Sequence, residues 1–169
     1  MPKGDRIHYV NEADVRVVLG RLPTEVWLRH RAVHFNDRSR GNRLLGHANR
    51  NRTEISLCAL PPRIALTRGL RSGHAPERFG AAAGRKWPAL AVRRFILYNV
   101  FLHELGHLQV IKEKSSSERL KYAREKLAQA FATEWCDRFW SKPFRHPDPV
   151  HNPPSQAELA RVQALTADL

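Results

Sequence analysis

Cysteine is scarce in this sequence, and its scarcity excludes two kinds of small protein. Cys58 and Cys136 are the only cysteines among 169 residues, and no C-x-x-C pair occurs. A disulfide framework or a cysteine-based zinc ribbon needs more thiols at closer spacing. We therefore expect two buried thiols in a protein that folds around a hydrophobic core.

Long apolar runs are also missing. No stretch of about 18 uninterrupted apolar residues occurs, so no membrane span is expected. Residues 1–6 read M-P-K-G-D-R and lead into a polar segment instead of the apolar core of a signal peptide. These two absences predict a cytoplasmic protein, and its length predicts one main domain.

Acidic residues are outnumbered. The chain has 16 Asp and Glu against 29 Lys and Arg, a formal net charge of +13. This excess favours nucleic acid or an acidic protein as a partner, and the arginine-rich segments 38–52 and 63–86 are the candidate basic face. No RNP, zinc-finger or basic-zipper signature accompanies the charge. A genome-wide arginine bias explains the same composition equally well, so both interpretations stay open.

The hydrophobic pattern predicts helices and short strands without the strict alternation of a doubly wound sheet. The expected elements, in chain order, are a helix from Asn11 to Gly20, a helical turn from Thr24, strands over 32–35, 44–48 and 54–60, a long connection over 67–88, a central helix from Pro88, a helix from 118 to about Trp140, and a last helix from Gln156. The fold class is therefore α+β with a small antiparallel or mixed sheet. We expect a domain over 1–142, followed over 143–169 by a proline-rich linker and the short last helix.

The central helix carries the most informative motif, because residues 103–107 read H-E-L-G-H. Two histidines four apart share one helix face and can both bind one zinc ion, while the glutamate beside them can deprotonate a water molecule. On a helical wheel Asn99 joins His103, Glu104 and His107 in one polar stripe on an otherwise apolar helix. Burying these groups without partners is costly, so we predict a metal site. Gly106 predicts close packing by another backbone.

A catalytic zinc usually takes three protein ligands plus water, so a third ligand must come from elsewhere. A metzincin would carry glycine at 110 and histidine at 113, but Val110 and Glu113 stand there. The following helix supplies the remaining acids, of which Glu118 is assigned to its N-terminal cap. Glu125 is favoured because small residues on its side permit close helix packing; Glu134 is the second choice and Glu113 the third.

Two stretches together resemble a known family. After the motif at 103–107, residues 125–132 read E-K-L-A-Q-A-F-A. This resembles the ImmA/IrrE group of minimal gluzincin-type metallopeptidases, whose pattern is H-E-L-x-H and then E-x-x-A-[ND]-x-F-A. The resemblance covers residues 88–140 and implies a minimal zincin-like fold, His103, His107 and Glu125 as zinc ligands, and Glu104 as catalytic base.

The chain departs from that family at one position, since Gln129 stands where Asn or Asp is preferred. The upstream half is more loosely similar to small zincins in general, including SprT-like proteases. His146 and His151, in the proline-rich segment, are minor alternatives as ligands. Candidates for stabilising the oxyanion of the transition state are His47, Tyr122 and the arginines of the segment 63–86.

These observations predict a zinc-dependent metallopeptidase acting on a protein or peptide substrate. The substrate would add as a strand to an exposed sheet edge, at 44–48 or 54–60. The alternative is a basic regulatory protein, associated with nucleic acid or with a repressor, in which the same fold holds a structural or vestigial metal.

Overall fold

The computed structural model of the chain describes residues 6–28, 30–37, 45–49, 51, 53–60, 76–109, 117–142 and 145–167. These ranges form a mixed α+β fold, which confirms the predicted fold class. The elements are α1 (Glu12–Arg21), α2 (Thr24–Trp27), β1 (Ala32–Asn36), β2 (Gly46–Ala48), β3 (Glu54–Cys58), the 3-10 helix η3 (Pro76–Phe79), α3 (Ala89–Phe95), the π-helix η4 (Ile96–Phe101), α4 (Leu102–Gln109), α5 (Glu118–Ser141), the 3-10 helix η5 (Pro149–His151) and α6 (Gln156–Ala167). Within these ranges, no helix has the length and apolar character needed to cross a membrane.

The sheet is mixed and has the strand order β1-β3-β2. The central strand β3 pairs parallel with β1 and antiparallel with β2. Strands β2 and β3 form a hairpin, in which Oδ1 of Asn49 accepts hydrogen bonds from the backbone N–H groups of Thr53 and Glu54 at 2.8 and 3.1 Å. β2 is therefore an edge strand, whereas β3 is paired on both sides and offers no free edge.

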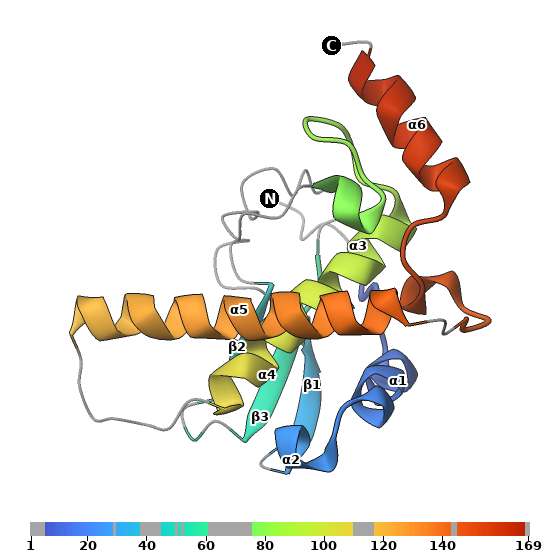
Figure 1. Ribbon diagram of the computed structural model, residues 1–169. Coiled ribbons are helices and arrows are strands. Elements are labelled where there is room, and N and C mark those ends of the chain that lie inside the picture. Colours follow the sequence, from blue (N-terminus) through green and yellow to red (C-terminus); the bar gives the residue numbers. More distant parts are fainter. Residues whose placement is uncertain are drawn as a thin grey trace.

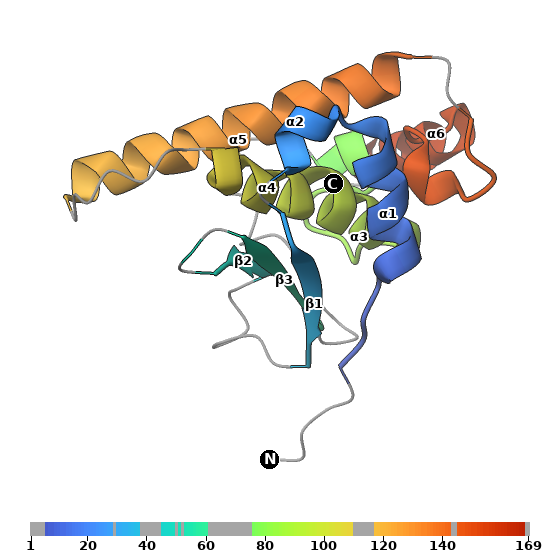
Figure 2. The same ribbon diagram turned by 90° about the horizontal axis from the view of Figure 1, so that it is seen from below.

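The helices stack on one side of the sheet. The continuous helical run α3–η4–α4 lies against the sheet, and α5 crosses this run on the side away from the sheet (Figure 1, Figure 2). The run is apolar nearly all round and forms the core, with Leu97, Phe101 and Leu105 fully buried. α5 continues beyond the end of α4, so the N-terminal end of α5 projects from the body of the molecule (Figure 1).

Gly106 brings α4 and α5 into backbone contact. A Cβ atom at this position would lie 2.9 Å from the carbonyl oxygen of Ala128 and 3.0 Å from its Cα. Real Cβ contacts are not this short, so the observed crossing requires glycine. The prediction that another backbone packs closely against Gly106 is confirmed.

Capping residues set the N-terminal ends of α1 and α6. Asn11 and Asp14 form a reciprocal capping box, with bonds of 3.0 and 3.1 Å between each side chain and the backbone N–H of the other. Ser155 and Glu158 do the same at the start of α6, at 2.8 and 3.2 Å. These boxes satisfy N–H groups that the first helical turn leaves without intrahelical partners.

The cap of α5 differs from the prediction for Glu118. Ser117 is the N-cap, and its side chain accepts a hydrogen bond from the backbone N–H of Leu120. Glu118 occupies the first helical position, two residues before the third position that a capping box requires, and instead pairs with Lys121 at 2.9 Å. The assignment of Glu118 to the cap was wrong because the cap register depends on which of three adjacent serines begins the helix.

The proline-rich segment after α5 packs into the domain. The guanidinium of Arg94, on α3, is 1% exposed and donates hydrogen bonds to three backbone carbonyl oxygens and to the carboxylate of Glu158. Val150 and His151, on η5, are 0% and 1% exposed. The described part of the segment that was expected as a linker therefore contributes to the interior, and α6 projects from it (Figure 1).

Candidate metal centre

Three side chains from two helices meet where α4 crosses α5. His103 and His107 lie one turn apart on α4, and Glu125 lies on α5. Nε2 of His103 is 3.0 Å from Oε2 of Glu125, and Nε2 of His107 is 3.1 Å from Oε1 of the same carboxylate. One ligand atom from each residue lies within 4.8 Å of the other two, so all three can contact one ion.

The close crossing of the helices places these groups. Ala128 and Ala132 are fully buried on the face of α5 that meets α4, and Gly106 removes the side chain that would keep the backbones apart. Glu125 lies one turn before Ala128 on α5, so its carboxylate reaches both imidazoles. Small residues on the side of Glu125 were the basis of its prediction, and the structure brings this residue to the histidine pair.

The donor set and the spacing fit zinc. Zinc lies about 2.0–2.2 Å from imidazole nitrogen and carboxylate oxygen, so neighbouring ligand atoms of a tetrahedral ion are about 3.3–3.5 Å apart. The nitrogen–oxygen separations of 3.0 and 3.1 Å are close to this value. The side chains of His103 and His107 are 18% and 15% exposed, whereas Glu125 is 59% exposed, so one side of the group is open. Three protein donors with an open side are typical of a catalytic zinc site.

The electrostatics of the group favour a cation beside Glu125. Hydrogen bonds from His103 and His107 hold the pKa of the Glu125 carboxyl far below its usual range. Burial opposes protonation of His103, but its hydrogen bond to Glu125 and the charges of Glu104 and Glu125 outweigh burial, and the pKa of His103 is raised. A divalent ion would take the place of the imidazole protons that Glu125 now contacts.

Glu104 is positioned between α4 and the edge strand β2. Its carboxylate accepts a hydrogen bond from the backbone N–H of Ala48 and interacts electrostatically with His107 and His103. Burial raises the pKa of Glu104, and the positive charges of the two histidines oppose this without cancelling it. A carboxylate with a raised pKa beside a metal site is suited to exchange a proton with water near neutral pH.

His103 has a second partner that was not predicted. Its Nδ1 lies 3.0 Å from Oε1 of Gln129, one turn beyond Glu125 on α5, and Nε2 of Gln129 donates to Oδ1 of Asn99 at 2.9 Å. Two features of the sequence are related to these contacts: Asn99 lies in the polar stripe of the central helix, and Gln129 follows Glu125 by four residues. Neither feature identifies a contact until the helices are placed against each other.

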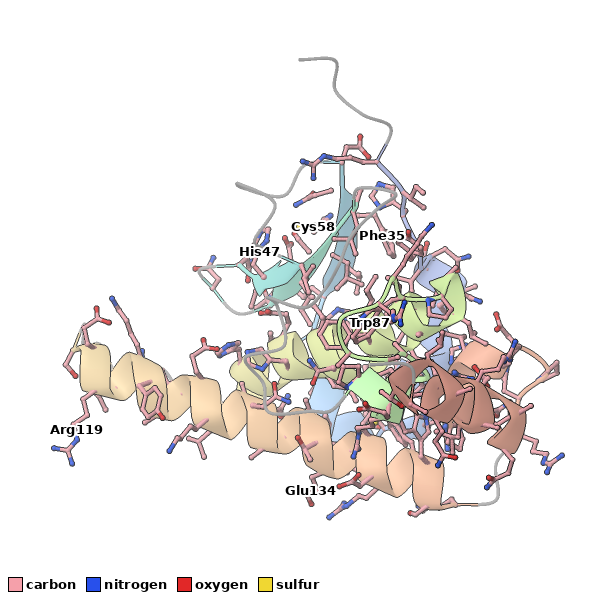
Figure 3. All side chains as sticks on the ribbon, turned by 90° about the horizontal axis from the view of Figure 1, so that it is seen from above. Phe35, His47, Cys58, Trp87, Arg119 and Glu134 are labelled. Carbon is pink, nitrogen blue, oxygen red and sulfur yellow. The ribbon has the colours of Figure 1, made fainter. Side chains whose placement is uncertain are left out.

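The competing ligand candidates lie elsewhere. Glu134 is on the outer side of α5, away from α4, and pairs with Arg138 (Figure 3). His151 is buried on η5, where its Nδ1 lies 2.8 Å from the hydroxyl of Tyr98. His146 packs its ring against His151, with ring centroids 4.5 Å apart. The third choice, Glu113, lies outside the described residues.

The oxyanion candidates receive no assignment. His47 lies on β2, and its buried Nδ1 has no hydrogen-bond partner among the described residues. Tyr122 is 63% exposed on α5, with Nζ of Lys126 4.9 Å from its ring centroid. Arg78 pairs with Asp137. Arg85 has a buried Nε without a hydrogen-bond partner among the described residues. The other arginines of the segment 63–86 lie outside the residues that the structure describes, namely Arg63, Arg68 and Arg71.

No protein-family model, no curated protein and no solved structure matches this chain.

Proposed function

We propose that this protein is a zinc-dependent metallopeptidase with a minimal zincin-like fold. The observation that carries the proposal is the convergence of His103, His107 and Glu125 on one point, with the partly buried carboxylate of Glu104 beside them. Two nitrogen donors, one carboxylate and an adjacent carboxylate that is not needed as a ligand are the groups that hydrolysis of an amide requires. A structural zinc site has four protein ligands, whereas three converge among the described residues, and a structural site would need no base such as Glu104.

The mechanism assigns a separate task to each group. His103, His107 and Glu125 would hold the ion. When bound, zinc supplies a Lewis acid that polarises the scissile carbonyl and lowers the pKa of water. Glu104 accepts a proton from the attacking water as the water oxygen adds to the carbonyl carbon. It then passes this proton to the leaving nitrogen as the C–N bond breaks.

The variant Glu104→Gln tests the proposed base. It keeps the shape of the side chain but cannot accept the proton, so we expect peptide hydrolysis to fall by about 10²–10⁴-fold while zinc stays bound. Hydrolysis would be measured on a library of quenched fluorescent peptides, and bound metal by elemental analysis. Glu134→Gln, on the outer side of α5, is the matched control and should keep the full rate. An unaltered rate in Glu104→Gln would refute the proposal.

The third ligand has its own pair of variants. Glu125→Ala removes the carboxylate that contacts both imidazoles, so we expect loss of stoichiometric zinc and of hydrolysis. Glu134→Ala removes a carboxylate of the same helix that pairs with Arg138, and both properties should persist. Retention of zinc by Glu125→Ala together with its loss from Glu134→Ala would reverse the assignment.

The net charge of +13 favours a second function, a regulatory protein that binds nucleic acid or an acidic partner. In that case affinity for DNA or RNA falls steeply with salt, and Glu104→Gln leaves this affinity unchanged. Loss of peptide hydrolysis in Glu104→Gln without any change in nucleic-acid affinity would show two separate activities. Nucleic-acid affinity without hydrolysis by the unaltered protein would select the second function alone.

A further inference from the structure

The amide of Gln129 connects the metal-binding imidazole of His103 to two other polar side chains. Oε1 of Gln129 lies 3.0 Å from Nδ1 of His103. Nε2 of the same amide donates to Oδ1 of Asn99 at 2.9 Å and approaches Oγ1 of Thr133 at 3.5 Å. An amide nitrogen has two protons, so Asn99 and Thr133 provide one acceptor for each.

The proton of Thr133 determines which way this amide points. The hydroxyl of Thr133 donates to the backbone carbonyl of Gln129 at 2.9 Å, which uses its single proton. Oγ1 can then face the side chain of Gln129 only as an acceptor, and this requires the NH₂ group on that side. The oxygen of the amide is consequently turned toward His103.

The direction of the amide sets the protonation of the imidazole. Opposite an amide oxygen, Nδ1 of His103 carries a proton and donates it, so the lone pair of a neutral ring is on Nε2, which faces Glu125. With the amide reversed, its NH₂ group would face Nδ1. The tautomer with the lone pair on Nδ1 would then be favoured, because Nδ1 would have to accept a hydrogen bond. Nε2 would then carry the proton and could not bind a metal ion.

Asn99 is held in place by the helical run itself. It is 6% exposed and lies in the π-helix η4, directly before α4. The π-helix has wider turns than an α-helix, so the side chains before His103 are rotated from their places on a regular wheel, and such segments are frequent at functional sites. A buried amide oxygen needs a donor, and Nε2 of Gln129 supplies it.

We propose that Asn99 and Thr133 lock the amide of Gln129, and that Gln129 is a positioning residue that fixes His103 to bind a divalent cation through Nε2. This inference rests on the proposed function for the presence of the cation. Gln129 orients the ring without adding charge, whereas a carboxylate there would place a second negative charge beside the ion. With the neutral amide, the bound ion therefore keeps more of its positive charge, but the affinity for the ion is lower than a carboxylate at 129 would provide.

Zinc affinity is the first test, measured by competition with a chromophoric chelator. We expect Gln129→Met to weaken zinc binding by about 10–100-fold, because methionine keeps the length of the side chain but lacks the amide oxygen that accepts from His103. Thr133→Val keeps the shape but removes the acceptor and should weaken binding several-fold, whereas Thr133→Ser should restore it. Gln129→Glu should bind zinc more tightly than the unaltered protein. Unaltered affinity in Gln129→Met would overturn the proposal.

Two spectroscopic measurements separate positioning from general stability. In the cobalt-substituted protein, Gln129→Met should shift the visible d–d bands, and Thr133→Ser should not. In the metal-free protein, the side-chain NH₂ protons of Gln129 should exchange slowly with solvent and should exchange fast in Thr133→Val. Equal exchange rates in Thr133→Val and the unaltered protein would refute the proposal that Thr133 fixes the orientation of the Gln129 amide. If the unaltered protein binds no zinc, the proposed function fails. The exchange measurement alone then shows whether Thr133 holds the Gln129 amide in one orientation.

Discussion

At the scale of single residues, Glu125 is more than half exposed and is still placed where it contacts both histidines of the proposed metal site. Its carboxylate contacts both imidazoles of α4, although its side chain is 59% exposed. The neighbouring acid Glu134 is equally exposed but contacts Arg138 instead. The two glutamates are alike in residue type and exposure. They differ in the face of α5 on which each lies, and this face decides which one reaches the histidines.

Gly106→Ala tests the close approach of α4 and α5. Its Cβ would lie 2.9 Å from the carbonyl oxygen of Ala128, so the helices must move apart. We expect overpacking to cost about 1–3 kcal/mol of the free energy of unfolding, more than the helix propensity of alanine returns, and zinc affinity to fall with it. Urea unfolding and chelator competition measure the two effects.

Gly20→Ala is the matched control for this variant. Gly20 also lies in a helix, α1, but a Cβ there meets nothing within 4 Å. Alanine should therefore stabilise the protein by up to about 1 kcal/mol. Equal stabilisation by both substitutions would contradict the close packing at Gly106.

At the scale of elements, the buried guanidinium of Arg94 on α3 holds the C-terminal segment against this helix. Arg94 is 1% exposed, and it is neutralised by Glu158 at 2.7 Å, in the first turn of α6. Because the same guanidinium also donates to three backbone carbonyl oxygens, η5 and the start of α6 share one anchor. The anchor joins elements more than fifty residues apart in sequence.

Glu158→Gln tests this anchor. It keeps the shape of the side chain but leaves the charge of Arg94 buried without a counter-ion, so we expect a loss of about 3 kcal/mol in the free energy of unfolding. Glu12→Gln, which alters an exposed pair with Arg16 on α1, should change stability by less than about 0.5 kcal/mol. Urea unfolding followed by circular dichroism distinguishes the two. Similar small changes in both variants would show that Arg94 does not depend on Glu158.

At the scale of the whole molecule, the proposed metal site would join α4 and α5, two helices that the unfolded chain does not hold together. Zinc should therefore bind the folded state and raise its stability by about 4 kcal/mol at a free concentration of 1,000 times Kd. Thermal unfolding with added zinc, and then with added chelator, measures this effect and its reversal. Glu125→Ala should abolish the rise in Tm, and Glu134→Ala should retain it. An equal rise in both variants would place the bound zinc elsewhere.

Acid should destabilise the whole molecule through His151. Burial lowers the pKa of His151 to about 4, and the nearby charge of His146 acts in the same direction. The unfolded chain, with a histidine pKa of about 6.5, takes up the proton first as the pH falls. The free energy of unfolding should therefore drop between pH 6.5 and 4, by up to about 3 kcal/mol, and this contribution is fully present above pH 6.5.

Urea unfolding at pH 7, 5.5 and 4 measures this dependence. His151→Gln does not titrate, so its profile should be flatter than that of the unaltered protein by the amount that His151 contributes. Glu158 adds a separate loss at lower pH, because hydrogen bonds from Arg94 outweigh burial and lower its pKa to about 2. Parallel profiles for His151→Gln and the unaltered protein between pH 7 and 4 would rule out His151 as the source.

Much of the fold could be predicted because its signals are local. The capping box of Asn11 and Asp14, the hairpin of β2 and β3, and the start of α6 each depend on residues a few positions apart. The parallel pairing of β1 with β3 and the π-helix within the central helix were not predicted. Both depend on how separate elements pack, and a regular helical wheel contains no information about an extra residue in one turn.

The sequence by itself determined that His103, Glu104 and His107 share one helix, because the hydrogen-bonded period of the helix places residues four apart on one face. Only the tertiary structure decided that Glu125 meets this pair while Glu134 does not, and that Gln129 contacts His103. The crossing of α4 and α5 depends on the fit of Gly106 against Ala128, a contact between residues far apart in the chain, and no periodicity within either helix specifies it.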